Sequence, residues 1–391
     1  VQSGAAKTLS GVTKVGTDQV QIALAQPDSG FMYLLLSGLY YILPQHALQD
    51  VDPTTLMDNS MWTEPGGVPG LGPFVMSANL PGQRVEFTRN PNFRQPVQFE
   101  TLIESLVTQD VATQQLSSGE IDLTLLQPTD VASVEGLSGV TLLKVDSPGF
   151  DRYTINQRKP YLQDKLVRQA FLTAIDRPGI IASVYSGLAS PDNTSFLAKG
   201  IDTSGFDTYD YDPAKAKDLL KQANWDANQK IEIVEVNNNA QRSAVNQVVL
   251  KNLQDVGVNA TIRQIDQAQV NTILNGDYDL LLYGGGNYIA DPSIDVPILS
   301  CATVYPNGAN LPGYCNKDMD ALFDQAKATA DPAQRMDFFN QAAKMENTDV
   351  PMLWMARPQR AYAYSAKITG GIQGGDGVPN VLLSVQDWTI G

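Results

Sequence analysis

One stretch near the middle of the sequence, from Asp151 to Gly187, constrains the fold more than any other. A short extended segment at 153–156 precedes Lys159-Pro160, where a turn is expected because the residue before a proline avoids the helical region. Asp164 can then cap a helix by accepting a hydrogen bond from a free backbone N–H. Apolar residues follow at helical spacing, at positions 166, 167, 170, 171, 174 and 175, with Lys165, Arg168, Gln169 and Thr173 expected on the opposite, polar face.

A second helix is predicted directly after the first. Asp176 is its cap, Pro178 stands in its first turn, and Gly187 is a natural stop. A strand, a turn and two capped helices within forty residues predict a rigid unit of an α/β protein.

The residues that frame this unit resemble a family signature. The pattern N-x-x-x-P-x-x-x-D-x-x-V-R-Q-A-x-x-x-A-I-D-R, from Asn156 to Arg177, resembles that of the large extracytoplasmic solute-binding proteins of family 5. These are the peptide- and nickel-type receptors of ABC importers. The resemblance implies an α/β, two-lobed fold of the periplasmic-binding-protein type (type II, the large class with an extra peripheral domain). Mixed sheets with helices on both faces are expected.

Length and charge are consistent with such a protein. A chain of 391 residues exceeds the size at which one core normally keeps growing, so at least two domains are expected. Its 43% hydrophobic and 18% charged residues are typical of a well-packed globular protein. A net charge of −15 argues against nucleic acid and against docking on an anionic lipid surface, because both would repel it.

The sequence gives no indication of a membrane span. The longest apolar stretch, Phe31 to Leu43, is too short to cross a bilayer and is expected to form a buried helix closed by Pro44. No signal peptide opens the sequence, so a mature or trimmed product is expected, and any lipid-anchoring cysteine would precede Val1.

The two cysteines, Cys301 and Cys315, lie close together in a turn-rich stretch. They favour a small-loop disulfide in an oxidising compartment, with two buried free thiols as the alternative. A metal site is not expected, because His46 is the only histidine and is distant in sequence.

The resemblance also implies a domain order. Residues 1–60 correspond to the end of the peripheral domain, 61–148 to part of lobe I, 149–362 to lobe II, and 363–391 to a return into lobe I. The family's opening segment is expected to be missing from this sequence. Hinges are expected near 145–156 and 362–368.

Strands and helices alternate in the second half of the chain, which favours an α/β lobe. Strands are predicted at 231–236, 258–265, 280–283 and 351–355, and helices at 213–223, 243–255, 319–328 and 332–346. Before the central stretch, strands are predicted at 74–78 and 84–89 and a helix at 111–116.

A candidate ligand site follows the strand at 280–283. Ligands of open α/β sheets bind beyond the carboxyl ends of strands, and here three glycines allow a close backbone approach. The candidate ligand-binding residues of this loop are Tyr283, Gly285, Asn287, Tyr288 and Asp291. A phosphate cradle is not indicated, because no G-K-[ST] follows.

Charged anchors for a peptide are suggested by the resemblance. In peptide-binding relatives the aspartate of a similar loop pairs with the ligand's α-amino group, so Asp291 is the expected amine contact. The alternative is that Asp291 only shapes the turn before Pro292. Arg242 approximates a position that holds a ligand carboxylate in relatives, with a solvated surface arginine as the alternative.

Three further candidates lie elsewhere in the sequence. Tyr153 and Asn156 begin the central unit at the expected crossing between lobes, where family members touch ligand. Trp354 could stack on a ligand, although a core tryptophan in a strand is the more common case.

Together these observations predict a receptor rather than an enzyme. We expect it to capture a short peptide (di- to oligopeptide) by hinge closure and deliver it to the permease subunits of an ABC importer. It would work as a monomer in the cell envelope, periplasmic or lipid-anchored, and no cofactor is implied. An oligosaccharide is the second ligand, stacked on Tyr283, Tyr288 and Trp354, and a nickel chelate is the third. A carboxylate-dependent hydrolase, using Asp291 and Asp295, is the alternative of another class.

Overall fold

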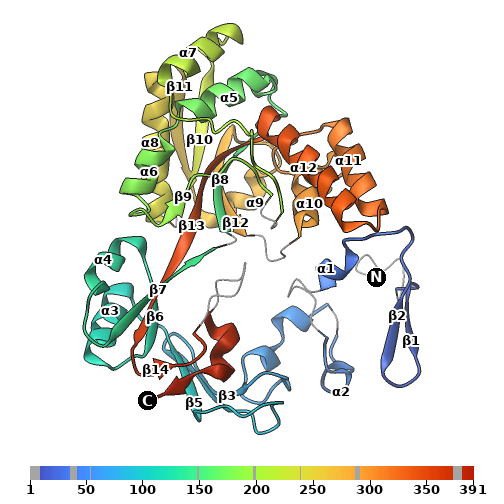
Figure 1. The fold of residues 1–391 in the computed structure, drawn as a ribbon, viewed down its shortest axis with the longest axis vertical. Coiled ribbons are helices and arrows are strands. Elements are labelled where there is room, and N and C mark those ends of the chain that lie inside the picture. Colours follow the sequence, from blue (N-terminus) through green and yellow to red (C-terminus); the bar gives the residue numbers. More distant parts are fainter. Residues whose placement is uncertain are drawn as a thin grey trace.

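A long strand, β13 (Met352–Ser365), runs through both halves of the protein (Figure 1). The computed structural model describes residues 9–35, 42–52, 54–147, 149–196, 200–237, 239–286, 291–372 and 381–391. β13 first pairs antiparallel with β8 (Gly149–Ile155) and then with β7 (Val140–Asp146) and β6 (Leu123–Leu126). It changes partners between Ala356 and Gln359, a few residues before the boundary expected at 362. The two lobes therefore share this strand.

Lobe II, the half built on β8 and the first part of β13, contains a mixed sheet. Its strand order is β11-β10-β12-β8-β13. The new strands are β10 (Lys230–Val236), β11 (Asn259–Ile265) and β12 (Leu280–Gly286). β10 is parallel to β11 and β12, whereas β12 is antiparallel to β8.

Helices cover both faces of this sheet, as expected from the resemblance. On one side are α5 (Lys165–Ala174), α6 (Arg177–Ser183), α7 (Pro213–Gln222) and α8 (Ala240–Asp255). On the other are α9 (Val270–Ile273), α10 (Val296–Leu299), α11 (Lys317–Ala328) and α12 (Pro332–Asp349) (Figure 1). Strand alternation explains the two layers, because successive side chains point to opposite faces. Ile233 packs with the first group and Val234 with α9.

The central stretch folds as its capping residues predict. Asp164 accepts from the Leu166 N–H at 2.8 Å, and Asp176 accepts from the Gly179 N–H at 2.9 Å. The expectation for Arg168 and Thr173 is wrong, since they are 4% and 0% exposed. For Arg168 the reason is tertiary: the C-terminal end of α12 lies against it, and its guanidinium donates to the carbonyls of Asp349 and Val350.

Lobe I combines a three-stranded antiparallel sheet with the end of the chain. Its sheet strands are β3 (Phe74–Leu80), β4 (Arg84–Arg89) and β5 (Thr101–Ser105), and its helices are α3 (Gln109–Ser118) and α4 (Val131–Val134). The tail adds β14 (Ile368–Thr369), the 3-10 helix η8 (Val381–Asp387) and β15 (Thr389–Ile390). Tyr362 of β13 packs with Val381 and Trp388 of the tail, so the chain returns to lobe I.

The N-terminal region has no core of its own. It forms a hairpin of β1 (Val12–Val15) and β2 (Gln19–Ile22), then α1 (Phe31–Leu35) and α2 (Gln45–Leu48). Among its described residues up to 60, only Gly30 is buried. The prediction of a buried helix at 31–43 is therefore wrong for its described part, because Met32 of α1 is 62% exposed. Residues 36–41 of that prediction lie outside the described part.

This region is attached to lobe II by a short anchor. The Ser29 N–H and hydroxyl donate to the carbonyls of Lys327 and Ala326 at 3.0 and 2.9 Å. Those carbonyls belong to the last turn of α11, where helical acceptors lack intrahelical partners. Throughout the described chain, no helix is both long and apolar enough to cross a membrane.

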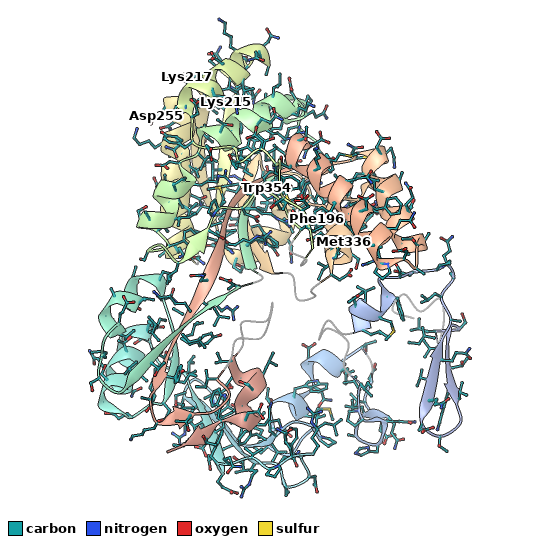
Figure 2. The ribbon with its side chains drawn as sticks, viewed as in Figure 1. Phe196, Lys215, Lys217, Asp255, Met336 and Trp354 are labelled. Carbon is teal, nitrogen blue, oxygen red and sulfur yellow. A yellow bond between two sulfur atoms is a disulfide. The ribbon has the colours of Figure 1, made fainter. Side chains whose placement is uncertain are left out.

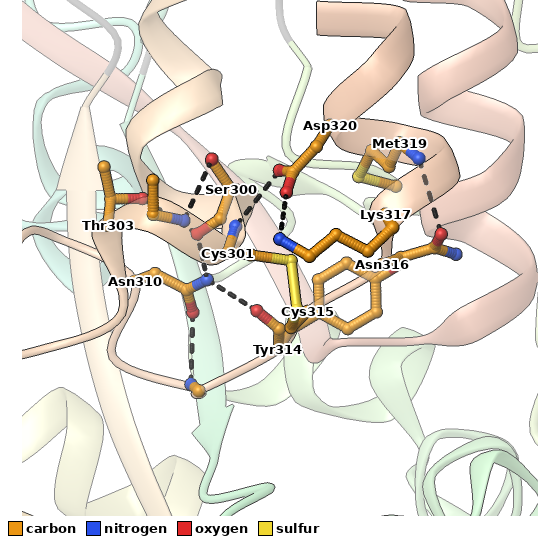
Figure 3. The surroundings of a disulfide bond; sticks show 12 residues. Ser300, Cys301, Thr303, Asn310, Tyr314, Cys315, Asn316, Lys317, Met319 and Asp320 are labelled. Carbon is orange, nitrogen blue, oxygen red and sulfur yellow. Dashed lines mark hydrogen bonds and ion pairs between the residues drawn. A yellow bond between two sulfur atoms is a disulfide. The ribbon is translucent and has the colours of Figure 1, made fainter.

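A disulfide joins Cys301 and Cys315 beside the N-terminus of α11 (Figure 3). Asn316 caps that helix, and Asp320 accepts from the Cys301 N–H at 3.1 Å. Asn310 crosses the enclosed loop by donating to the carbonyls of Ser300 and Tyr314. The bridge thus fixes the connection from α10 to α11.

Candidate functional site

The carboxyl ends of β10 and β12 lie at the edge of lobe II where the chain crosses from lobe I. β12 pairs with β8 up to Gly286, opposite Gly149, which is the first residue of β8. The end of one strand and the start of the other therefore meet at one place. This is the position at which open α/β sheets receive ligands.

The glycines at the end of β12 lie close to side chains of neighbouring elements. A Cβ on Gly284 would lie 2.0 Å from Nη2 of Arg242, and one on Gly285 would lie 2.7 Å from the ring of Phe150. Tyr283, by contrast, is 42% exposed. The predicted residues Tyr283 and Gly285 thus stand at the surface of this edge.

One side of the last part of β12 has no strand partner in the described chain. Pairing with β10 consists of Ile233 with Leu280 and Val234 with Leu281, whereas pairing with β8 continues through Gly286. From Leu282 to Gly286, no strand among the described residues pairs with this side of β12. Unpaired backbone groups must find hydrogen-bond partners in water or in a ligand.

Arg242 lies at this edge, but its guanidinium already has a partner. The helix expected from 243 begins earlier, capped by Asn239, so Arg242 is in the first turn of α8. Its Nη2 lies 3.2 Å from Oδ1 of Asp151, and Oδ2 of the same carboxylate accepts from the hydroxyl of Tyr185 at 2.7 Å. Burial and the nearby Asp151 raise the pKa of Tyr185, so it remains a donor.

Asp291 is held inside lobe II by a side chain of α12. Both of its carboxylate oxygens accept from Arg335 of α12 at 2.7 Å, and the residue is 3% exposed. It also caps a 3-10 turn by accepting from the Ser293 N–H. These contacts agree with the alternative that Asp291 shapes the turn before Pro292, and the amine contact stays a prediction.

The same arginine connects this loop to the N-terminal region. Nε of Arg335 donates to the Ser29 hydroxyl at 3.0 Å, and the guanidinium lies 5.7 Å from the ring centre of Tyr33. Gly30 fits tightly here, since a Cβ would lie 3.2 Å from Nη2 of Arg335. Asp291 and Ser29 are therefore bound to one side chain.

Replacing Asp291 with asparagine is expected to flatten the acid-side dependence of stability on pH. Burial alone raises the pKa of Asp291, but hydrogen bonds from Arg335 and Ser293 outweigh burial and hold the pKa below its ordinary value of 3.8. A group with a lowered folded-state pKa stabilises the fold above its unfolded-state pKa, and this contribution is lost as the pH falls through the folded-state value. Urea unfolding below about pH 4 should show a steeper loss for the wild type. If the stability of both proteins fell equally steeply with decreasing pH, the lowered pKa of Asp291 would be contradicted.

Three other predicted ligand residues are buried in lobe II. Tyr153 and Asn156 are 0% exposed; the first donates to Asn246, and the second donates to the carbonyls of Gly276 and Tyr278. Trp354 is 1% exposed and packs inside the lobe (Figure 2). Residues of a mixed central sheet are covered on both faces, which explains this burial, and their contact with a ligand stays a prediction.

Two predicted residues, Asn287 and Tyr288, lie outside the described residues and stay a prediction. Sequence reasoning missed Asp151 and Arg335, the partners of the two expected anchors. Asp151 is the first residue of the central stretch, and this position was a signal that could have identified it as a site residue. Nothing in the neighbouring sequence distinguishes Arg335 within α12. No group of three or more metal-ligating side chains occurs in the part of the chain that the structure describes.

Two hollows are found on lobe II. One, of about 330 Å³, adjoins the edge and is lined by residues at the ends of β10 and β11 and the start of α8: Glu235, Val236, Asn237, Asn239, Ala240, Ser243 and Gln264. The other, of about 540 Å³, lies between the N-terminal ends of α5 and α11 beside the disulfide. The first lies at the carboxyl end of β10. The second is bordered by Arg168, each of whose three guanidinium nitrogens donates to a main-chain carbonyl.

The sequence pattern of the bacterial extracellular solute-binding proteins, family 5 Middle, matches residues 2–304. The chain belongs to this family. A Brucella ovis protein named as an ABC transporter peptide-binding protein is 31% identical over 351 residues, which are 86% of this chain and 66% of that protein. The peptide transport periplasmic protein SapA of Haemophilus influenzae is 26% identical over 381 residues, 93% of this chain and 65% of its own length. The chain thus spans slightly less than two thirds of these relatives.

Solved structures share the fold. The substrate-binding protein CtaP of Listeria monocytogenes superposes with a TM-score of 0.82 at 23% identity, over 97% of this chain and 77% of that one. The oligopeptide-binding protein AppA of Bacillus subtilis, solved with a nonapeptide, gives 0.80 at 21% identity, over 97% and 78%. The family resemblance and the two-lobed α/β fold expected from the sequence are both confirmed.

Proposed function

We propose that this protein is a receptor that captures a short peptide between its two lobes by hinge closure and delivers it to the permease of an ABC importer. Membership of an extracellular solute-binding family and the peptide-binding names of its relatives support this proposal. It would act outside the cytoplasm, releasing its ligand unchanged. The hinge would lie where β7 passes into β8 and where β13 changes partners, around Ala356 to Gln359.

The observation that favours a peptide is the side of β12 that no described strand pairs with after Leu281. An extended peptide can add to an exposed strand edge, where main-chain hydrogen bonds provide affinity independent of side-chain identity. Residues 282–286 could accept such a strand, because they pair with β8 on one side only among the described strands, and Tyr283 within them is 42% exposed. An oligosaccharide would depend on stacked aromatic rings, and of the rings expected to stack, Trp354 is buried in the core.

N-methylation of the ligand's backbone is expected to weaken binding by at least about tenfold. The methyl group removes a main-chain donor and prevents close approach to a strand edge, while the side chains stay the same. Calorimetry should compare a short peptide with its singly N-methylated forms, using an oligosaccharide panel and analysis of the recovered ligand as controls. Saccharide binding without peptide binding, or hydrolysis of the peptide, would overturn the proposal.

A further inference from the structure

The anchor that attaches the N-terminal region to lobe II consists of residues 28–33. The N–H and hydroxyl of Ser29 donate to carbonyls in the last turn of α11 at 3.0 and 2.9 Å. Oδ2 of Asp28 lies 3.5 Å from Nζ of Lys327, in the same turn. Arg335 of α12 donates to the Ser29 hydroxyl at 3.0 Å, and its guanidinium carbon lies 5.7 Å from the ring centre of Tyr33. Hydrogen bonds, an ion pair and a cation–π contact therefore join this segment to two helices of lobe II.

The segment approaches lobe II most closely at Gly30. A Cβ at this position would lie 3.0 Å from Oγ of Ser293 and 3.2 Å from Nη2 of Arg335. Gly30 is buried, although Met32, two residues later, is 62% exposed. A large side chain in place of Gly30 would therefore push the segment away from lobe II.

The chain that follows the anchor is held by lobe I. Asn79 of β3 donates to the carbonyl of Thr63 at 2.9 Å, and Asn90, which follows β4, donates to the carbonyl of Gly72 at 2.8 Å. Residues 63–73 are thus fixed to lobe I directly before β3 begins. The N-terminal region is therefore attached to lobe II at one end and to lobe I at the other.

The anchor and the proposed hinge lie on opposite sides of the molecule. Figure 1 shows β7 and β13 crossing between the lobes on the left, and α1 beside the helices of lobe II on the right. A rotation about the crossing strands would separate the lobes most on the side of the anchor. Opening of this kind must pull residues 28–33 away from α11 and α12, because the following chain stays with lobe I.

We propose that the anchor is a latch, which joins the two lobes when they are closed and separates when they open. This inference rests on the hinge closure of the proposed function. The open and closed states of such a protein differ by a small free energy, so a few hydrogen bonds are sufficient to shift their populations. Arg335 also holds Asp291, which links the latch to the loop that follows β12. A latch that favours the closed state raises ligand affinity, because a larger fraction of the molecules is ready to hold the ligand.

X-ray scattering of the ligand-free chain tests the latch without any ligand. Gly30→Leu should force residues 28–33 off lobe II. Gly70→Leu is the matched control, because a Cβ on Gly70 meets nothing closer than 4.0 Å. Asp28→Cys with Lys327→Cys, joined by a short thiol cross-linker, should hold the latch closed. Wild type treated with the same reagent controls for its effects, since both native cysteines form the disulfide.

The radius of gyration of Gly30→Leu should exceed that of the cross-linked protein by about 1 Å or more. Wild type and Gly70→Leu should agree with each other and lie within these limits. Equal radii for Gly30→Leu and the cross-linked protein would overturn the inference, because the anchor would then not restrain the lobes. Ser29→Ala removes only the hydroxyl contacts, should shift the radius in the same direction by less, and replaces Gly30→Leu if that variant folds poorly.

Peptide calorimetry separates the latch from the receptor proposal. Gly30→Leu should bind a short peptide about fivefold more weakly than wild type, whereas Gly70→Leu should bind it equally well. Equal affinities of the two leucine variants would contradict the latch. If the radii follow the expected order and no protein, wild type included, binds a peptide, the receptor proposal fails and the latch stands.

Discussion

Replacing Arg335 with alanine is expected to lower the free energy of unfolding by about 3–5 kcal/mol. The substitution leaves the Asp291 carboxylate, which is 3% exposed, without its cation and without two hydrogen bonds of 2.7 Å. It also removes the donor to the Ser29 hydroxyl. Removing one member of a buried ion pair is costly because the remaining charge stays buried. Urea unfolding at neutral pH measures the effect.

The control for this prediction is a more exposed ion pair on the same anchor. Lys327 lies 3.5 Å from Asp28, with a lysine side chain that is 52% exposed. Lys327→Ala should therefore cost less than about 1 kcal/mol. The double variant Asp291→Asn with Arg335→Ala should be more stable than Arg335→Ala alone, since it removes the uncompensated charge. If Arg335→Ala were as mild as Lys327→Ala, the buried pair would not stabilise this part of the fold.

Replacing Arg168 with alanine is expected to cost about 4 kcal/mol or more. Its guanidinium is buried and donates to the main-chain carbonyls of Leu162, Gln163, Asp349 and Val350 at 2.6–3.1 Å. Burial lowers the pKa of Arg168, and the nearby Asp349 opposes that shift. Without the arginine, these carbonyls lose their donors, and the link between the start of α5 and the end of α12 is broken.

Thermal and urea unfolding of three variants would test this assignment. Arg168→Lys keeps the charge but cannot reach four carbonyls at once, so its stability should lie between those of the wild type and Arg168→Ala. Arg89→Ala is the exposed control: its partner Glu100 has a side chain that is 68% exposed, and the loss should be below about 1 kcal/mol. Full rescue by lysine would show that charge alone, and not the shape of the guanidinium, matters here.

Local signals were sufficient to place most of the elements. Asp164, Asp176 and Asp212 each cap a helix at the position that the sequence indicates. A capping aspartate acts on backbone groups two or three residues away, so its effect is visible within a short window. The unbroken apolar run at 280–282 likewise identified a central strand. The exposed helix α1 shows the limit of such reasoning, because apolar composition alone does not provide a surface to bury it.

What the sequence by itself determined is therefore the order of strands and helices, the family, and the strand end at which a ligand site is predicted. Which side chains remain free at that strand end was decided only by the tertiary structure. Asp291 meets Arg335 across 44 residues, and Arg242 meets Asp151 across 91. No local pattern reports pairings of that separation, because they form only when the sheet brings distant segments together. Arg242 and Asp291, the two charged residues that the sequence offered as ligand anchors, thus have partners within lobe II.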